Sequence, residues 1–345
     1  MLNLRTFFVF YSLIMGNSLV FADCPHSPIA PYTDHLNVVS KYDPNDPTRS
    51  TPATPDPESE AIQYQLNQYA GYIAQISDYY VIAPDTHRKQ LAIECLDLWL
   101  NLWANANALA TEEINHTGYA VRSWALSTIA SSSYQVMISS QNQWAPSSNA
   151  LRWMIQLAYE NSGYYYARTF QTPDKVNNHD YWAAWAATAT GIITKDRNLL
   201  DWGYSILTFS LDQSILDRQT NTAYWPNEIG RARLGAYYSH FALSPVVAMA
   251  VLLPNQGYVL HQEQYSKLTQ LAEFTAKFTI NPRSVQHINE YTQVYMNGSL
   301  LYWSKLYNQA FSNEITQSLE SNFEQQIRPL PQLGGDISQI FVSTN

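Results

Sequence analysis

The chain is poor in cysteine, in basic residues and in long apolar segments. Only 2 of its 345 residues are cysteine, and 19 Lys and Arg stand against 28 Asp and Glu, which gives a formal net charge of −9. A surface this negative argues against nucleic acid and against general binding of polyanions, so an anionic ligand needs a local basic cleft. After the first residues, no segment shows the roughly 20 apolar residues of a membrane-spanning helix, which argues against membrane insertion.

The N-terminal residues have the pattern of an export signal. Arg5 precedes an apolar run, and the small residues Val20 and Ala22 stand at the −3 and −1 positions of a cleavage site. We therefore expect residues 1–22 to be removed. The mature chain, residues 23–345, is expected to be a soluble periplasmic protein, with secretion from the cell as the alternative.

The compartment also bears on the two cysteines. In an exported protein, Cys24 and Cys95 most simply form one disulfide that ties an N-terminal arm to a helix, and two free thiols are the alternative. The arm itself, up to about Pro57, shows no stable periodicity. Its residues 43–52 are rich in proline and polar turn formers, which is typical of an extended segment with an exposed loop.

Beyond the arm, the pattern is helical and no alternating strand pattern of comparable length competes with it. Apolar residues recur at helical spacing at Ile62, Leu66, Tyr69 and Ile73. Short connections between such segments favour antiparallel neighbours, so we expect a single all-α domain of stacked helical hairpins. Later helices are expected near residues 148–168, 179–193, 199–217, 231–253, 263–280 and 298–322.

The stretch Asn177–Trp185 gathers two amides, an imidazole, a carboxyl group, a phenol and two indoles, and a small apolar run follows it. An Asn before a helix is a favoured N-cap, and aromatics three and four residues apart share a helix face. One interpretation is therefore structural, with the amides as caps and the rings as core. The other is a set of polar groups presented at the mouth of a packed helix.

Three other stretches carry candidate chemistry. The loop 40–57 contains Lys41, Tyr42 and Arg49. It is either a solvated loop or a lid over a cleft. The stretch Asn115-His116-Thr117-Gly118 reads as a turn that opens a helix. The third contains Glu228, Arg231 and Tyr238; the last two are seven residues apart, which would place them on one helix face.

The motifs of this chain also resemble those of a known enzyme family. Asn177-Asn178-His179, followed by Tyr181-Trp182-Ala183-Ala184-Trp185, resembles the signature of the alginate lyases of polysaccharide lyase family 5, the poly(β-D-mannuronate) lyases. Further blocks match in the same order over nearly the whole mature chain. They are Pro31-Tyr32-Thr33, Ser40-Lys41-Tyr42, Arg49-Ser50-Thr51, Glu94-Cys95, Asn115-His116-Thr117-Gly118, Trp124-Ala125-Leu126, Asp201-Trp202, Pro226-Asn227-Glu228, Tyr238, Ala242-Leu243 and Leu333-Gly334-Gly335-Asp336.

The resemblance implies an incomplete α/α toroid with an N-terminal lid loop, and β-elimination of a mannuronate-rich uronan. This chemistry requires no metal or cofactor, and we expect the protein to be a monomer. The resemblance also implies the Cys24–Cys95 disulfide. The catalytic residues that it implies are Asn178, His179, Arg231 and Tyr238. The substrate-binding residues that it implies are Lys41, Tyr42, Arg49, Asn115, His116 and Trp124.

These residue types suit the chemistry. Elimination begins with loss of the C5 proton, which is far too weakly acidic while the neighbouring C6 carboxylate keeps its charge. Asn178, His179 and Arg231 around that carboxylate would stabilise the enolate-like state. Tyr238 would then act as the base, and Arg231 on the same helix face is expected to favour its ionised form.

Some positions depart from the family pattern. Asp180 stands where a Ser is usual and is expected to add negative charge near the site. Ser239, His240 and Phe241 replace His, Asn and Tyr, and the arginine cluster is reduced to Arg231 and Arg233. The alternatives to a mannuronate lyase are therefore a lyase for polyglucuronate or another acidic polysaccharide, a non-catalytic uronan-binding or export scaffold, and a hydrolase that uses Asp180 and Glu228 as its carboxyl pair.

Overall fold

A computed structural model describes Cys24 and residues 26–342, so the predicted signal peptide and its cleavage site lie outside the described residues. The described chain is almost entirely helical. Its elements are α1 (Pro57–Ile82), α2 (Thr86–Asn105), α3 (His116–Ser139), α4 (Ser148–Gln171), α5 (Asn178–Thr194), α6 (Arg197–Asp212), β1 (Ile215–Asp217), β2 (Thr222–Tyr224), α7 (Pro226–Ile229), α8 (Gly235–Leu252), α9 (Gln262–Ile280), α10 (Tyr302–Ala310), α11 (Glu314–Phe323) and α12 (Ser338–Val342), with short 3-10 turns between some of them.

Most of the long helices begin at a short polar side chain that accepts a hydrogen bond from the first turn. Asp56 caps α1 through the Ser59 N–H, and Pro57 occupies the first helical position. The same type of cap starts α2, α3, α4, α5, α6 and α11, at Asp85, Asn115, Ser147, Asn177, Asp196 and Asn313. The local sequence therefore defines where these helices start.

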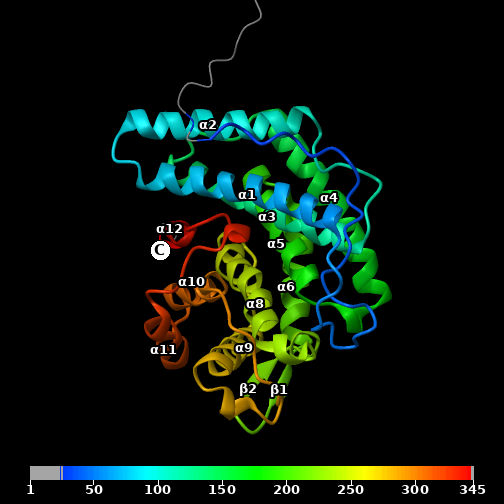
Figure 1. Cartoon of the computed structure of the whole chain (residues 1–345). Helices are drawn as coiled ribbons and strands as arrows, with labels where there is room; N and C mark the ends of the chain where they lie inside the picture. The colour runs from blue at the N-terminus through cyan, green and yellow to red at the C-terminus, as the bar shows by residue number, and fades with distance from the viewer. Residues whose placement is uncertain (1–23, 25, 343–345) are drawn as a thin grey trace, which may run out of the picture.

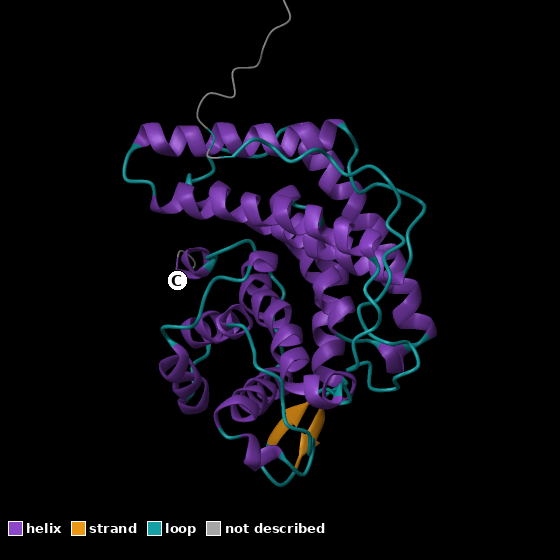
Figure 2. Ribbon diagram, in the orientation of Figure 1, coloured by secondary structure: helices purple, strands orange, loops and turns teal. Residues whose placement is uncertain are grey.

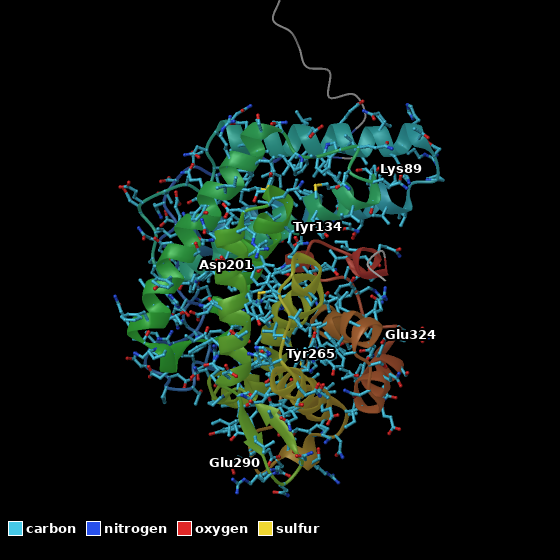
Figure 3. All side chains as sticks on the ribbon, turned by 180° about the vertical axis from the view of Figure 1, so that it is seen from behind. Lys89, Tyr134, Asp201, Tyr265, Glu290 and Glu324 are labelled. Carbon is cyan, nitrogen blue, oxygen red and sulfur yellow. A yellow bond between two sulfur atoms is a disulfide. The ribbon has the colours of Figure 1, made fainter. Side chains whose placement is uncertain are left out.

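The helices form two layers that curve around one core (Figures 1 and 2). In the inner layer α1 contacts α3, α3 contacts α5, α5 contacts α8, and α8 contacts α10. The outer layer follows the same sequential order: α2 contacts α4, α4 contacts α6, α6 contacts α9, and α9 contacts α11. Consecutive helices pair as hairpins across the two layers, and side chains fill the space between them (Figure 3). The predicted all-α toroid of helical hairpins is confirmed.

Helix α5 lies at the centre of this arrangement and contacts α3, α4, α6 and α8. It is apolar nearly all round, as expected for a helix enclosed on every side. Alanines between its aromatics allow the neighbouring backbones to approach, and Trp182 and Trp185 are fully buried. The aromatic residues of the Asn177–Trp185 stretch therefore belong to the core, as the structural interpretation holds.

Some predicted boundaries are wrong. The segment 199–217 stops being helical at Asp212, after which β1 and β2 form a small antiparallel hairpin with Leu216 opposite Ala223. The loop that follows α9 packs on this hairpin, where His287 Nε2 lies 3.0 Å from Asp217 Oδ1, near the labelled Glu290 of Figure 3. The segment 298–322 is a 3-10 turn followed by α10 and α11. Three-residue strands are too short to show an alternating pattern.

The N-terminal arm follows the prediction. Cys24 and Cys95 form a disulfide that spans 71 residues of sequence and joins the arm to α2. The Leu36 N–H also donates to the Glu113 carbonyl at 2.7 Å, which holds the arm against the start of α3.

Helix α8 and its flanking turns form an apolar segment, Ala232–Gln256, whose length and mean hydropathy of 1.5 match a membrane span. The sequence-based expectation that no such segment follows the signal is therefore wrong by this criterion. However, 89% of the segment's most apolar window is buried inside the protein, which is the usual property of a core helix.

The C-terminal segment packs against α1 and α3, at the beginning of the inner layer. Ser132 Oγ donates to the Gly334 carbonyl at 3.2 Å, and the Asp336 N–H donates to Asp78 Oδ1 at 2.7 Å. Gly334 and Gly335 have positive φ angles of 96° and 92°. A Cβ on Gly335 would lie 2.5 Å from both Asp78 carboxylate oxygens, so only glycine fits there.

We therefore predict that Gly335→Ala lowers the free energy of unfolding by about 2–4 kcal/mol, combining left-handed backbone strain with a steric clash. Gly163→Ala is the matched control, because Gly163 is an exposed position of α4. Apart from the backbone of its own helix, no atom lies within 4 Å of the added Cβ. The control should be neutral or more stable by up to about 1 kcal/mol. Denaturant unfolding measures both values, and equal values for the two variants would contradict the prediction.

Candidate active site

Two adjoining cavities lie beneath the 40–57 loop, at the N-terminus of α5. The larger has a volume of about 660 Å³ and the smaller about 100 Å³. Arg49, His116, His179 and Arg231 line both of them. A separate, mostly apolar cavity of about 430 Å³ lies between α1 and α2 beside the disulfide, and it includes none of the predicted catalytic residues.

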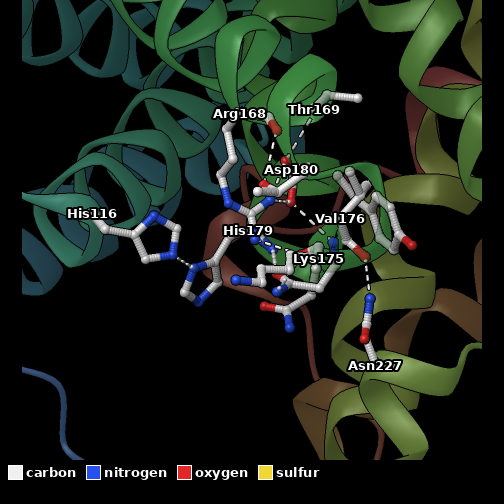
Figure 4. Close-up of polar contacts among 12 residues, drawn as sticks. His116, Arg168, Thr169, Lys175, Val176, His179, Asp180 and Asn227 are labelled. Carbon is white, nitrogen blue, oxygen red and sulfur yellow. Dashed lines mark hydrogen bonds and ion pairs between the residues drawn. The ribbon is translucent and has the colours of Figure 1, made fainter. Parts of the chain in front are cut away.

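The first turn of α5 is held by Asn177 and Asp180. Asn177 Oδ1 accepts the His179 N–H at 2.9 Å, and Asp180 Oδ2 accepts the Asn177 N–H at 2.9 Å, which makes a reciprocal capping box. Asp180 is fully buried and pairs with Arg168 from α4 at 2.5 Å (Figure 4). The expectation that Asp180 adds negative charge to the site is wrong, because its carboxylate is neutralised inside the protein.

Asn178 is the first residue of α5 and is buried together with Glu228 from α7. The Asn178 backbone N–H and its side-chain Nδ2 donate to the two Glu228 carboxylate oxygens at 2.7 and 2.9 Å. Burial raises the pKa of Glu228 to about 7, despite these hydrogen bonds and the nearby Arg231. Glu228 thus turns the Asn178 amide so that its NH₂ group lies toward α7.

His179 contacts the neighbouring helix α3 through a second imidazole. Its Nδ1 lies 3.2 Å from His116 Nε2, and His116 Nδ1 lies 2.9 Å from the Tyr164 hydroxyl. The two imidazoles meet edge to edge in Figure 4. Burial lowers the pKa of His116 to about 4 and that of His179 well below its ordinary value, and the neighbouring cations act in the same direction. Both rings are therefore neutral at neutral pH.

Arg231 and Tyr238 lie together, although not as predicted. Arg231 precedes a 3-10 turn over Ala232–Leu234, and α8 begins only at Gly235, so the two do not share a helix face. The guanidinium instead stacks on the Tyr238 ring, with Cζ 3.9 Å from the ring centroid. Burial raises the pKa of Tyr238 well above its ordinary value, although Arg231 opposes this shift. Arg231 therefore favours the ionised form, as expected, but desolvation outweighs its charge.

The 40–57 loop folds over this pair as two short paired arms. The Asp43 N–H donates to the Thr51 carbonyl at 3.0 Å, and the Ala53 N–H donates to the Lys41 carbonyl at 2.9 Å. At the tip, the Asp46 carboxylate accepts hydrogen bonds from the Thr48 hydroxyl and from several backbone N–H groups, which hold its pKa well below the usual range. The sequence features of the tip therefore build an ordered turn.

Cleft residues bind this loop directly. Tyr238 donates to the Tyr42 hydroxyl at 2.9 Å, and Arg231 donates two hydrogen bonds to the Arg49 carbonyl at 3.2 and 2.6 Å. Arg233 donates to the Ser50 carbonyl at 2.9 Å. The fork of Arg231, which suits a carboxylate, is thus occupied by a backbone carbonyl of the loop.

The remaining predicted binding residues differ in position. Trp124 lines the smaller cavity, with its ring edge-on to His179 at 5.8 Å between centroids, and Lys41 lies 5.3 Å from the centroid of the Tyr42 ring. Asn115 instead caps α3, because its Oδ1 accepts the Gly118 N–H at 2.9 Å and its Nδ2 donates to the Val38 carbonyl. Among the residues described here, Asn115 lines neither cavity; its substrate-binding role stays a prediction.

The departures on α8 lie within the core. His240 is fully buried, accepts a hydrogen bond from Trp303 Nε1 at 2.8 Å and contacts Thr279, and burial lowers its pKa to about 3. Phe241 packs edge-on against Trp124 at 5.8 Å. Neither side chain lines either cavity.

The hydrolase alternative finds no support in this geometry. Asp180 and Glu228 are both fully buried, and each accepts hydrogen bonds from protein N–H groups. Two carboxyl groups that flank a glycosidic bond must reach the substrate.

Among Cys24 and residues 26–342, no group of three or more His, Cys, Asp or Glu side chains could hold a metal ion.

Sequence reasoning missed the partners of the predicted residues. Arg168 and Tyr164 stand in α4 without any local motif, so nothing in the sequence indicates that they meet α5. Glu228 lies in a matched block, but its position next to Asn178 follows only from the packing of α7 against the start of α5.

Comparison with known proteins gives one consistent result. Residues 37–285 match the family model described as alginate lyase. An alginate lyase of Pseudomonas aeruginosa is 30% identical over 258 residues, which cover 74% of this chain and 67% of the relative. One of Pseudomonas fluorescens is 27% identical over 319 residues, covering 90% and 83%.

Solved structures agree in fold. Alginate lyase A1-III from Sphingomonas species A1 superposes with a TM-score of 0.68 at 18% identity, over 90% of this chain and 84% of that one. A variant of the same lyase complexed with a tetrasaccharide gives a TM-score of 0.72 at 17% identity, with the same coverage. The toroid is therefore shared with these structures.

The buried Glu228 leads to a prediction on stability. Its pKa is raised from 4.5 to about 7, so the folded protein holds a proton that the unfolded chain releases, and the free energy of unfolding falls as pH rises across that interval. Glu228→Gln removes this dependence. Relative to the parent, the variant should gain up to about 3 kcal/mol between pH 5 and pH 8. Denaturant unfolding at both pH values measures the difference, and a parent-to-variant gap that does not change with pH would contradict it.

Proposed function

Because the chain belongs to the alginate lyase family, we propose that it cleaves mannuronate-rich alginate by β-elimination, leaving a 4,5-unsaturated uronate at the new non-reducing end. The enzyme class follows from the family: the chain is a polysaccharide lyase, which breaks a carbon–oxygen bond. The mannuronate preference and the roles of individual residues are the proposal.

One observation carries the residue roles: the Arg231 guanidinium stacks on Tyr238 beside His179 in the same cavity. Loss of the C5 proton moves negative charge onto the C6 carboxylate, so donors aimed at that group stabilise the transition state. Arg231 supplies a charged fork, and His179 supplies a neutral N–H donor. Asn178 adds the second hydrogen of its side-chain NH₂ group, because Glu228 accepts only the first. These three groups come from the 3-10 turn before α8 and from the first turn of α5.

Tyr238 serves as the group that moves the proton. In mannuronate the C5 proton and the C4 oxygen lie on the same side of the ring, so one phenol can accept the first and then donate to the second. Burial keeps the phenol protonated in the substrate-free protein, and the stacked Arg231 favours the ionised form. The base form therefore becomes more populated as pH rises, which supports greater activity at alkaline than at acidic pH.

The cleft also supports an anionic polymer as substrate. The protein carries a net charge of −9, yet Arg49, Lys175 and Arg231 line its larger cavity. We propose that the 40–57 loop acts as a lid, in which Lys41, Tyr42 and Arg49 contact the substrate. A carboxylate then replaces the Arg49 carbonyl on Arg231, because a charged acceptor makes the stronger hydrogen bond.

Export fits this substrate, which occurs outside the cytoplasm. We propose that the mature protein acts as a monomer in the periplasm. The Cys24–Cys95 disulfide supports an oxidising compartment, since such bonds persist there and are rare in the cytosol.

The proposal predicts a near-ultraviolet absorbance gain when the protein acts on polymannuronate, because elimination conjugates a new C4–C5 double bond with the carboxylate. Polyguluronate, polyglucuronate and a neutral glucan complete the panel. A gain on polyglucuronate alone would favour the second lyase candidate. Binding without a gain on every uronan would point to a non-catalytic scaffold.

The role of Tyr238 predicts that Tyr238→Phe lowers kcat by roughly 10²–10⁴-fold while the dissociation constant for polymannuronate changes little. Tyr237→Phe is the matched control, since Tyr237 directly precedes Tyr238 on α8. Its ring lies near Lys41, whereas the Tyr238 ring stacks against Arg231. The control should keep activity close to the parent. If Tyr238→Phe stayed within tenfold of the parent, another group would be the base.

The proposed lid predicts that Lys41→Ala raises KM severalfold with a smaller effect on kcat, because an exposed lid cation binds substrate before and during the reaction. Lys267→Ala is the control, since Lys267 lies in the outer layer and pairs with Asp212 and Glu263. Steady-state kinetics on polymannuronate measures both variants, and an unchanged KM for Lys41→Ala would remove the lid assignment.

A further inference from the structure

A row of three side chains lies along the wall of the larger cavity. Tyr164 lies on α4, His116 opens α3, and His179 stands in the first turn of α5. The Tyr164 hydroxyl is 2.9 Å from His116 Nδ1, and His116 Nε2 is 3.2 Å from His179 Nδ1. Only the Nε2 atom of His179 is then left for the cavities that this residue lines.

Both imidazoles in this row are neutral, because burial and nearby arginines lower the pKa of His116 to about 4 and that of His179 well below its ordinary value. A neutral imidazole carries one N–H and one lone pair. Burial also raises the pKa of Tyr164, so its phenol keeps its proton. The hydrogen bonds along the row can therefore run in either of two directions. One direction leaves an N–H group at His179 Nε2, and the other leaves a lone pair there.

In the first direction, Tyr164 donates to His116 Nδ1, the His116 Nε2–H donates to His179 Nδ1, and His179 presents Nε2–H to the cleft. In the second direction all hydrogen bonds reverse and His179 presents a lone pair. A phenol is the better donor and an imidazole nitrogen the better acceptor of the Tyr164–His116 pair. This preference selects the first direction.

The surroundings of His179 favour the same result. Arg49 and Arg231 line the smaller cavity beside it, so an anion is the ligand that the charges attract. An N–H group donates to a carboxylate, whereas a lone pair repels it. The ring is also fixed in orientation, because Trp124 contacts it edge-on at 5.8 Å.

We propose that Tyr164 is a positioning residue that acts through His116 to fix the tautomer of His179, so that His179 Nε2–H donates to the carboxylate of the uronate. The inference rests on the proposed function for its substrate. The tautomer itself is a property of the free protein and does not depend on which polysaccharide is cleaved.

The test uses the variant Tyr164→Phe. Phenylalanine keeps the ring that stacks on Tyr119 at 3.8 Å and removes only the hydroxyl. Loss of an outer hydrogen-bond partner of a functional histidine costs roughly 10–100-fold, and we expect that loss in kcat on polymannuronate rather than in KM. Tyr119→Phe is the control, because it keeps the same stack and the Tyr164 hydroxyl, and it should retain parental kcat.

Nitrogen-15 NMR of histidine side chains in the free protein gives the direct measurement, with the His179 signals assigned by comparison with His179→Gln. The parent should show the proton on Nε2, and Tyr164→Phe should show a mixture with the Nδ1–H form. A parental proton on Nδ1 would overturn the proposal, as would an unchanged tautomer and unchanged kcat in Tyr164→Phe. Failure of the proposed function would look different: no uronan would yield unsaturated product, whatever the tautomer.

Discussion

The ion pair between Arg168 and Asp180 holds the first turn of α5, and the geometry of the cleft depends on that turn. Asp180 is fully buried, so its carboxylate needs both the guanidinium and the Asn177 N–H to offset the loss of water. Removing one partner of such a pair typically costs about 3–5 kcal/mol. Arg168 also donates to the Lys175 carbonyl at 2.5 Å, which fixes the segment that leads into α5. A buried charge thus serves to place Asn178 and His179.

Around this turn, each functional group is held by a partner from another helix. Glu228 of α7 orients the Asn178 amide, His116 of α3 contacts the His179 ring, and Arg231 lies against Tyr238. Partners that come from separate, tightly packed elements restrict the positions of the groups they hold. The toroid supplies such elements, because α5 is enclosed by α3, α4, α6 and α8. Donors held in place before substrate arrives lose little energy to reorganisation during the reaction.

The same arrangement explains how an acidic protein accommodates an anionic polymer. Arg49, Arg168 and Arg231 line the larger cavity, where the Asp180 charge is paired with Arg168 and Glu228 favours its neutral form up to a pH of about 7. In the substrate-free structure the fork of Arg231 holds the Arg49 carbonyl. In the proposed mechanism the loop and a substrate carboxylate compete for one guanidinium, which would link the position of residues 40–57 to occupancy of the site.

The sequence by itself determined the helical class and the pairing of consecutive helices, because periodicity and caps are local properties. The expected compartment and the family resemblance both indicated the disulfide, and the resemblance supplied several of the residues beside the cleft. Only the tertiary structure decided what those residues do to one another. It placed Arg231 on the ring of Tyr238 from outside α8, turned Asp180 away from the cleft, and showed that burial governs the pKa of Tyr238. Desolvation and long-range hydrogen bonds depend on which helices pack together, and no local pattern in one chain carries that information.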